Sequence, residues 1–209
     1  MSNFFRKHFC QFFSSAGVVL LLLNQLSCST LIQVSHRNQS LLLILHGTGE
    51  SSLMYENFWK EDAKKSGMMV LAPQIAKSYS NSKSDLEELN RLLNLTAQKN
   101  KISKEKIFIL GISSGATIAS WFIRNYPDSC RAAIVVHPYP INEFEGLSQP
   151  VLIVAADQDS QYHLNQLKLD ELVKKYPNFT VYVDAEAGHE YKKKWNEVIL
   201  TWLRQKQLL

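Results

Sequence analysis

The sequence has little cysteine, glycine and proline. Its 209 residues include three cysteines, eight glycines and six prolines. Cys10 and Cys28 belong to an apolar N-terminal stretch, so the rest of the chain keeps only Cys130, which excludes a disulfide framework. With no catalytic base beside it in sequence, Cys130 is expected to be a buried, unreactive thiol. No internal repeat, low-complexity tract or Pro/Gly-rich linker interrupts the chain, and we predict one folded domain over residues 38–209.

Neither sign of charge is in large excess. The chain has 23 Lys and Arg against 19 Asp and Glu, a formal net charge of +4. The run Lys192–Lys194 is typical of a solvated helix start, so we expect no nucleic-acid partner. A hydrophobic content of 45% supplies enough apolar material for the core of a domain of this size, which excludes a disordered chain.

Residues 1–30 are predicted to be a signal peptide or a membrane-anchoring leader. The basic pair Arg6-Lys7 precedes the apolar stretch Phe9–Leu23, which is shorter than the roughly 20 residues of a membrane span. Leu26-Ser27-Cys28 resembles a bacterial lipoprotein box, but Gln25 stands where that pattern has an aliphatic residue. We therefore expect an exported protein, either secreted or periplasmic or held at a membrane. A lipidated Cys28, a plain cleaved end and an uncleaved anchor stay open as alternatives.

From Ser40 onward, short apolar runs alternate with longer amphipathic ones. The alternation predicts an α/β fold with a mostly parallel sheet of about six strands, right-handed crossovers and helices on both faces. The expected strands are Leu41–Leu45, Met68–Ala72, Lys106–Leu110, Ala132–Val136, Val151–Ala155 and Thr180–Val183. The expected helices are Met54–Lys65, Ser84–Gln98, Ser114–Asn125, Tyr162–Tyr176 and Tyr191–Gln205.

The strongest functional signal is a G-x-S-x-G motif, Gly111-Ile112-Ser113-Ser114-Gly115. It lies between a predicted strand and a predicted helix, which is the setting of a nucleophilic serine on a sharp turn. Side chains at positions 111 and 115 would collide with neighbouring backbone, so both glycines are expected to be steric requirements. A tight turn whose serine only caps the next helix is the competing interpretation.

A nucleophilic serine needs a base and an acid that orients the base, and in this arrangement they follow it in the order acid, then histidine. Asp157 and Asp159 follow one strand, and His189 follows the last strand, so each falls at the carboxyl end of a strand. We predict Ser113, Asp159 and His189 as the catalytic residues. Asp157 is kept as a competing acid or as the residue that closes the turn, and His137 is expected to be a rim residue or a packing residue.

The segment Leu45-His46-Gly47-Thr48-Gly49 follows the first expected strand. We expect its backbone to supply half of an oxyanion hole through the Thr48 N–H, with the Ser114 N–H as the other half. His46 is expected to stabilise this loop by hydrogen bonding. No Lys-Ser/Thr pair follows the segment, so it is a poor phosphate-binding loop.

These motifs resemble the α/β-hydrolase superfamily, and within it the cap-less phospholipase/carboxylesterase, dienelactone-hydrolase and polyhydroxybutyrate-depolymerase-like esterases. The resemblance spans roughly residues 41–203. Within this span, Ile102–Phe108 and Tyr126–Asp128 are similar to the segments on either side of the serine turn and its helix in those esterases. The connection between the strands ending at Val136 and starting at Val151 is too short for a lid domain. The resemblance implies an open site, which Tyr139 and Phe144 are expected to line.

The resulting hypothesis is a serine hydrolase that cleaves a carboxylic ester or thioester of a small molecule or lipid, with no metal and no cofactor. Two alternatives remain. One is a peptidase with the same catalytic residues, and the other is a hydrolase-like binding protein without activity, because function belongs to sites and not to folds.

Overall fold

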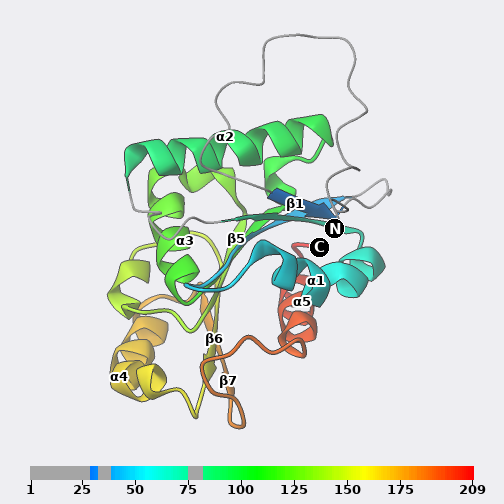
Figure 1. Ribbon diagram of the computed structural model, residues 1–209. Helices are drawn as coiled ribbons and strands as arrows, with labels where there is room; N and C mark the ends of the chain where they lie inside the picture. The colour runs from blue at the N-terminus through cyan, green and yellow to red at the C-terminus, as the bar shows by residue number, and fades with distance from the viewer. Residues whose placement is uncertain (1–28, 33–38, 75–81) are drawn as a thin grey trace, which may run out of the picture.

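The computed structural model describes residues 29–32, 39–74 and 82–209, and its centre is one seven-stranded sheet (Figure 1). The strands lie in the order β1-β3-β2-β4-β5-β6-β7. The six strands from β2 to β7 run parallel, as predicted, and their apolar runs are buried on both faces except along the edge strand β7. Their bounds are β2 Ser40–Leu45, β3 Met68–Pro73, β4 Ile107–Ile112, β5 Ala132–Val136, β6 Val151–Ala156 and β7 Phe179–Asp184.

The seventh strand, β1 (Ser29–Ile32), was not expected from the sequence. It pairs antiparallel with β3, so that Ser29 lies opposite Pro73. The first two residues of β1 are the last two of the predicted leader, and residues 1–28 of that leader lie outside the described residues. In the part of the chain that is described, no helix has the length and apolar character needed to cross a membrane.

Helices cover both faces of the sheet and make three layers (Figure 1). Alternate residues of each strand point to opposite faces, so Leu41, Leu43 and Leu45 pack with α2, α3 and α4, whereas Leu42 and Ile44 pack with α1 and α5. The helices are α1 Ser52–Ser66, α2 Lys83–Lys99, α3 Ser114–Asn125, α4 Ser160–Lys175 and α5 Trp195–Gln205.

The last helix begins later than the sequence pattern predicted. We expected it from Tyr191, but α5 begins at Trp195, because the preceding residues form the loop that carries His189. Tyr191 packs inward from this loop, and its hydroxyl donates to Asn196 Oδ1 at 2.7 Å. Tyr191 anchors the loop, but its position in the sequence continues the spacing of the buried residues of α5. The spacing alone therefore predicted a helix that began too early.

Residues 137–150, which connect β5 to β6, contain only a short 3-10 helix, Ile141–Phe144. Within the described residues no helical lid lies over the ends of the strands, as predicted. The expectation that Phe144 lines an open site is wrong, because its side chain is fully buried in the core beside α3. Tyr139 is exposed, and its backbone carbonyl accepts a hydrogen bond from Thr117 Oγ1.

Cys130 is a buried free cysteine, as the sequence predicted. Burial raises the pKa of its thiol to about 12, so almost none is the reactive thiolate at neutral pH. The structure therefore gives the one cysteine among its described residues a packing role.

Candidate active site

Ser113 lies at the turn between β4 and α3 with a strained backbone. Its φ of 52° and ψ of −118° are unusual for a residue with a side chain. Its N–H donates to the carbonyl of Val136 at 2.9 Å, which fixes the turn to the neighbouring strand β5. Ser113 makes no side-chain cap bond to α3, which removes the helix-cap interpretation of this serine.

The two glycines of the motif are steric requirements, as predicted. A Cβ at Gly115 would lie 2.0 Å from the carbonyl oxygen of Leu45, and one at Gly111 would lie 2.5 Å from the carbonyl oxygen of Gly115. Both contacts are with backbone, which cannot swing aside. The absence of side chains lets β4, α3 and the end of β2 approach closely enough to place Ser113 beside the loop that follows β2.

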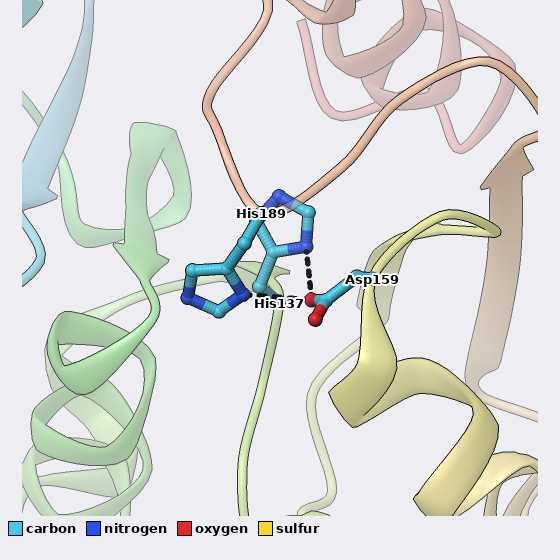
Figure 2. Close-up of side chains that lie close together, drawn as sticks. All are labelled: His137, Asp159 and His189. Carbon is cyan, nitrogen blue, oxygen red and sulfur yellow. Dashed lines mark hydrogen bonds and ion pairs between the residues drawn. The ribbon is translucent and has the colours of Figure 1, made fainter.

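The structure brings the three predicted catalytic side chains together. Ser113 Oγ lies 3.0 Å from His189 Nε2, and His189 Nδ1 lies 2.7 Å from Asp159 Oδ2 (Figure 2 shows the histidine and the aspartate). The Asp159 carboxylate can only accept, so Nδ1 of His189 donates and Nε2 accepts from the serine hydroxyl. His189 is 47% exposed and Asp159 only 4%, so the imidazole reaches the surface while its partner is buried.

Asp157, the competing acid, lies elsewhere. Its side chain is exposed, and its Oδ1 is 4.0 Å from Nε2 of His163, a residue of α4. The expectation that Asp157 closes the turn is also wrong. Asp159 does this itself, because it is the N-cap of α4 and accepts from the Gln161 N–H at 2.9 Å. One buried aspartate therefore both starts the helix and faces the histidine.

The surroundings of Asp159 favour its ionised form. Burial by itself would raise the pKa of the carboxyl. The hydrogen bonds from His189 and from the Gln161 N–H, together with the positive ends of the nearby imidazoles, outweigh burial and hold that pKa below its usual range. The Asp159 carboxyl is therefore ionised at neutral pH.

The loop after β2 contacts the serine turn directly. Thr48 Oγ1 donates to Ser114 Oγ at 2.9 Å, which links the two residues predicted to supply oxyanion donors. The Gly47 N–H is committed to Glu50 Oε2 at 2.7 Å, and the buried Tyr55 hydroxyl donates to the same oxygen at 2.8 Å. Glu50 and Tyr55 were not identified from the sequence, although they fix the shape of this loop.

His46 stabilises the loop, as expected. Its Nδ1 lies 2.9 Å from the Gly47 carbonyl, and its Nε2 lies 3.0 Å from Nε2 of Gln74. Gln74 Oε1 accepts in turn from the Ser52 N–H, so the loop is tied to the end of β3 and to the start of α1.

His137 is closer to the site than the sequence indicated. It packs as expected, edge-on to Trp195 at 5.3 Å between centroids. Its Nδ1 is also 3.1 Å from Asp159 Oδ2, so two imidazoles face one carboxylate oxygen (Figure 2). A histidine placed directly after the carboxyl end of a strand was the signal that could have identified it.

His137, Asp159 and His189 also offer atoms that zinc accepts, all within 4.8 Å of one another. Two ligands of a tetrahedral zinc ion are about 3.3 Å apart, as its bond lengths require. The 2.7 Å between His189 Nδ1 and Asp159 Oδ2 is a hydrogen-bond distance instead. The spacing is therefore that of hydrogen-bonded groups and does not match a metal centre.

Asp184 anchors the loop that carries His189. It is 4% exposed, accepts from Trp195 Nε1 at 2.7 Å and pairs with Lys194 Nζ at 2.7 Å. Burial would raise the pKa of this carboxyl, but Lys194, Trp195 and the Glu186 N–H lower it overall. Asp184 therefore connects the end of β7 to the start of α5.

We predict that Asp184→Asn destabilises the fold at pH 7 by about 1–3 kcal/mol. A carboxyl whose pKa is lowered on folding stabilises the folded state at pH values above its unfolded pKa of about 3.9. This stabilisation is lost as the pH falls through the pKa of the carboxyl in the folded state. The difference between native and variant protein should hence shrink below about pH 4. Urea unfolding at pH 7 and pH 3 measures it, and a difference that stays constant would contradict the prediction.

The comparisons with known proteins agree with this fold. A model of the alpha/beta hydrolase fold family matches residues 40–149, more than half of the chain. A carboxylesterase from Bacillus cereus superposes with a TM-score of 0.64 at 22% identity over 85% of this chain and 93% of that one. An S-formylglutathione hydrolase from Staphylococcus aureus gives 0.68 at 16% identity over 85% and 91%.

The esterase PE8 gives a TM-score of 0.65 at 16% identity, covering 85% of this chain and 97% of its own. A search of curated protein sequences found no match. At these identities the structural neighbours establish the fold alone, and the family match comes from the sequence itself. The chain belongs to the alpha/beta hydrolase family.

Proposed function

We propose that the protein is a serine hydrolase that cleaves a carboxylic ester or thioester through an acyl-enzyme intermediate. Ser113 is the nucleophile, His189 the base and Asp159 the residue that orients His189. The observation that carries the proposal is the chain of contacts from Ser113 Oγ to His189 Nε2 at 3.0 Å and from His189 Nδ1 to Asp159 Oδ2 at 2.7 Å.

In the first half of the reaction, Ser113 Oγ attacks the carbonyl carbon while His189 Nε2 takes the hydroxyl proton. The carbonyl oxygen becomes negative and is bound by the Thr48 and Ser114 N–H groups. The bond to the leaving group then breaks, and His189 returns the proton to the departing alcohol or thiol. The buried Asp159 carboxylate stabilises the imidazolium that exists between these two transfers.

In the second half, water attacks the acyl-enzyme and His189 Nε2 takes a proton from it. The second tetrahedral intermediate releases the carboxylic acid, and His189 returns the proton to Ser113 Oγ. The chain's own side chains supply each transfer in this scheme. The exposed imidazole gives water access to the acyl-enzyme, which hydrolysis requires.

The most direct test is labelling of the purified protein with a fluorophosphonate, followed by assays on p-nitrophenyl esters of graded acyl length, acyl thioesters and aminoacyl amides. Labelling with faster turnover of esters or thioesters is the expected result. Preferential cleavage of amides would favour a peptidase of the same fold. No labelling of well-folded protein would refute the proposal and favour a binding protein without activity.

The identity of the acid can be tested separately. Asp159→Asn is expected to lower kcat by about 10³- to 10⁴-fold, because the amide no longer stabilises the imidazolium and leaves His189 in the wrong tautomer. Asparagine also caps helices well, so the start of α4 should persist. The matched control Asp157→Asn should retain activity within about twofold, since Asp157 is exposed and faces His163. Equal losses in the two variants would contradict the assignment.

For cellular location we propose export through the N-terminal leader, either as a secreted or periplasmic protein or as one held at a membrane by an acylated Cys28 or by the leader itself. The basic pair and apolar stretch of residues 1–30 support this proposal. Mass spectrometry of the mature N-terminus distinguishes the outcomes. A lipidated Cys28, a free cleaved end and an intact leader each give a different mass, and an intact leader in a soluble fraction would refute the proposal.

A further inference from the structure

The histidine at position 137 is held in a conformation that a packing role alone does not explain. It follows β5 directly with a φ of 51°, in the left-handed region that non-glycine residues rarely adopt. Its side chain is fully buried, and its ring lies 4.7 Å from that of His189, tilted by 32°. The backbone therefore accepts strain that places this imidazole against the catalytic pair.

Each nitrogen of His137 faces an acceptor. Nδ1 lies 3.1 Å from Asp159 Oδ2, and Nε2 lies 3.4 Å from the Glu190 carbonyl. The approach of Nδ1 is too oblique for a well-aligned hydrogen bond, so the contact is mainly electrostatic. A bare Nδ1 lone pair this close to a full negative charge would be repelled more than one near a neutral carbonyl. The carboxylate therefore favours the tautomer with the proton on Nδ1, whereas the longer contact of Nε2 with the Glu190 carbonyl favours the other tautomer.

The neutral form is also the one its surroundings favour. Burial lowers the pKa of His137, and the nearby His189 lowers it further, against the opposing effects of Asp159 and of the hydrogen bond to the Glu190 carbonyl. A positive charge at this position would oppose the imidazolium that His189 becomes during catalysis. A neutral ring with its proton on Nδ1 would stabilise Asp159 without that cost.

The Asp159 carboxylate has room to turn if it is not held. A small cavity beside it is lined by His137, Gln161, Tyr162 and Asn165, among others. The Gln161 N–H donates to Oδ1, and His189, whose side chain is exposed, donates to Oδ2. His137 supplies a third contact from the rigid end of β5, which neither the α4 cap nor the His189 loop can provide.

We propose that His137 is a positioning residue: its neutral ring carries the proton on Nδ1, and the electrostatic attraction between this N–H and Asp159 Oδ2 keeps that oxygen directed at His189 Nδ1. The inference rests on the proposed function, because it assigns a role in the same proton transfer. His137 touches no reacting atom in this scheme and acts only through Asp159. Its removal should thus lower kcat and leave KM nearly unchanged.

Two variants separate the N–H from the ring. His137→Phe keeps a flat ring against Trp195 but has no donor. His137→Asn loses the ring but places an amide N–H at the δ position, and asparagine tolerates a positive φ. With p-nitrophenyl acetate, we expect His137→Phe to lose about 10- to 100-fold in kcat with KM within about twofold. His137→Asn should stay within about fivefold of the native kcat.

A double-mutant cycle with Asp159→Asn tests whether His137 acts through that carboxylate. In this background His137→Phe should cost less than about twofold. The proposal is overturned if His137→Phe keeps full kcat, if His137→Asn loses as much as His137→Phe, or if the loss is the same in both backgrounds. If native protein labels with fluorophosphonate while any of these results is obtained, the proposed function stands and only this inference fails.

A measurement on native protein is independent of whether the variants fold. Long-range ¹⁵N–¹H correlation spectra of protein with labelled histidine identify which ring nitrogen carries the proton. At neutral pH His137 is expected as the neutral Nδ1–H tautomer. A proton on Nε2 alone, or a doubly protonated His137 ring, would overturn the proposal.

Discussion

Ser113→Ala is expected to lower kcat by about 10⁴- to 10⁶-fold and to abolish fluorophosphonate labelling, while the fold persists. The reason is that Ser113 Oγ is the atom that His189 Nε2 contacts at 3.0 Å, and alanine has no oxygen to replace it. Alanine is no more strained than serine at the positive φ of this turn, so stability should change little. Activity and labelling are measured on the same preparation, with melting temperature as the check on folding.

The matched control for this variant is Ser120→Ala. Ser120 lies on α3, the helix that follows the nucleophile, and its hydroxyl donates only to the Thr117 carbonyl, at 2.7 Å. Its replacement removes a serine oxygen from the same helix without touching the site, so turnover within about twofold of native protein is expected. If Ser113→Ala retained its labelling or its turnover, another residue would have to be the nucleophile.

The parallel sheet was predictable because its strands are buried on both faces and so appear as continuous apolar runs between amphipathic helices. The serine turn was predictable for a related reason. The sequence Gly111 to Gly115 satisfies a steric requirement that few strand-to-helix connections have, and the structure shows the two close contacts that require glycine. Both features follow from short segments of the sequence, without knowledge of which distant residues are in contact.

The features that were missed depend on contacts between segments far apart in the sequence. Phe144 and Tyr139 occupy the same short connection, and only packing against α3 decides that one is buried and the other exposed. His137 lies 22 positions before Asp159 in the sequence, and no local pattern indicates that His137 and His189 face the same oxygen of Asp159. Glu50 likewise acquires its role from a tyrosine hydroxyl and a glycine N–H that the fold places around it.

Gly115→Ala is expected to cost at least about 3 kcal/mol of unfolding free energy or to prevent folding altogether. The added Cβ would lie 2.0 Å from the carbonyl oxygen of Leu45, 2.6 Å from the carbon of that carbonyl and 2.7 Å from the oxygen of His46. These atoms belong to the last residue of β2 and to the residue after it, and β2 is held between β3 and β4 and cannot retreat without breaking the sheet. Overpacking against fixed backbone is among the few single changes with effects this large.

Any folded Gly115→Ala protein should also be nearly inactive, because the shifted backbone is the one that leads into Gly47 and Thr48. The stability control is Gly188→Ala, whose Cβ would meet only the carboxylate end of Glu190, at 3.0 Å, which can rotate away. Urea unfolding followed by circular dichroism should show a loss under about 1 kcal/mol for this control. A Gly115→Ala protein as stable as the control would mean that β2 and α3 can move apart at the serine turn. The close approach that positions Ser113 against the Thr48 loop would then not be a fixed property of the fold.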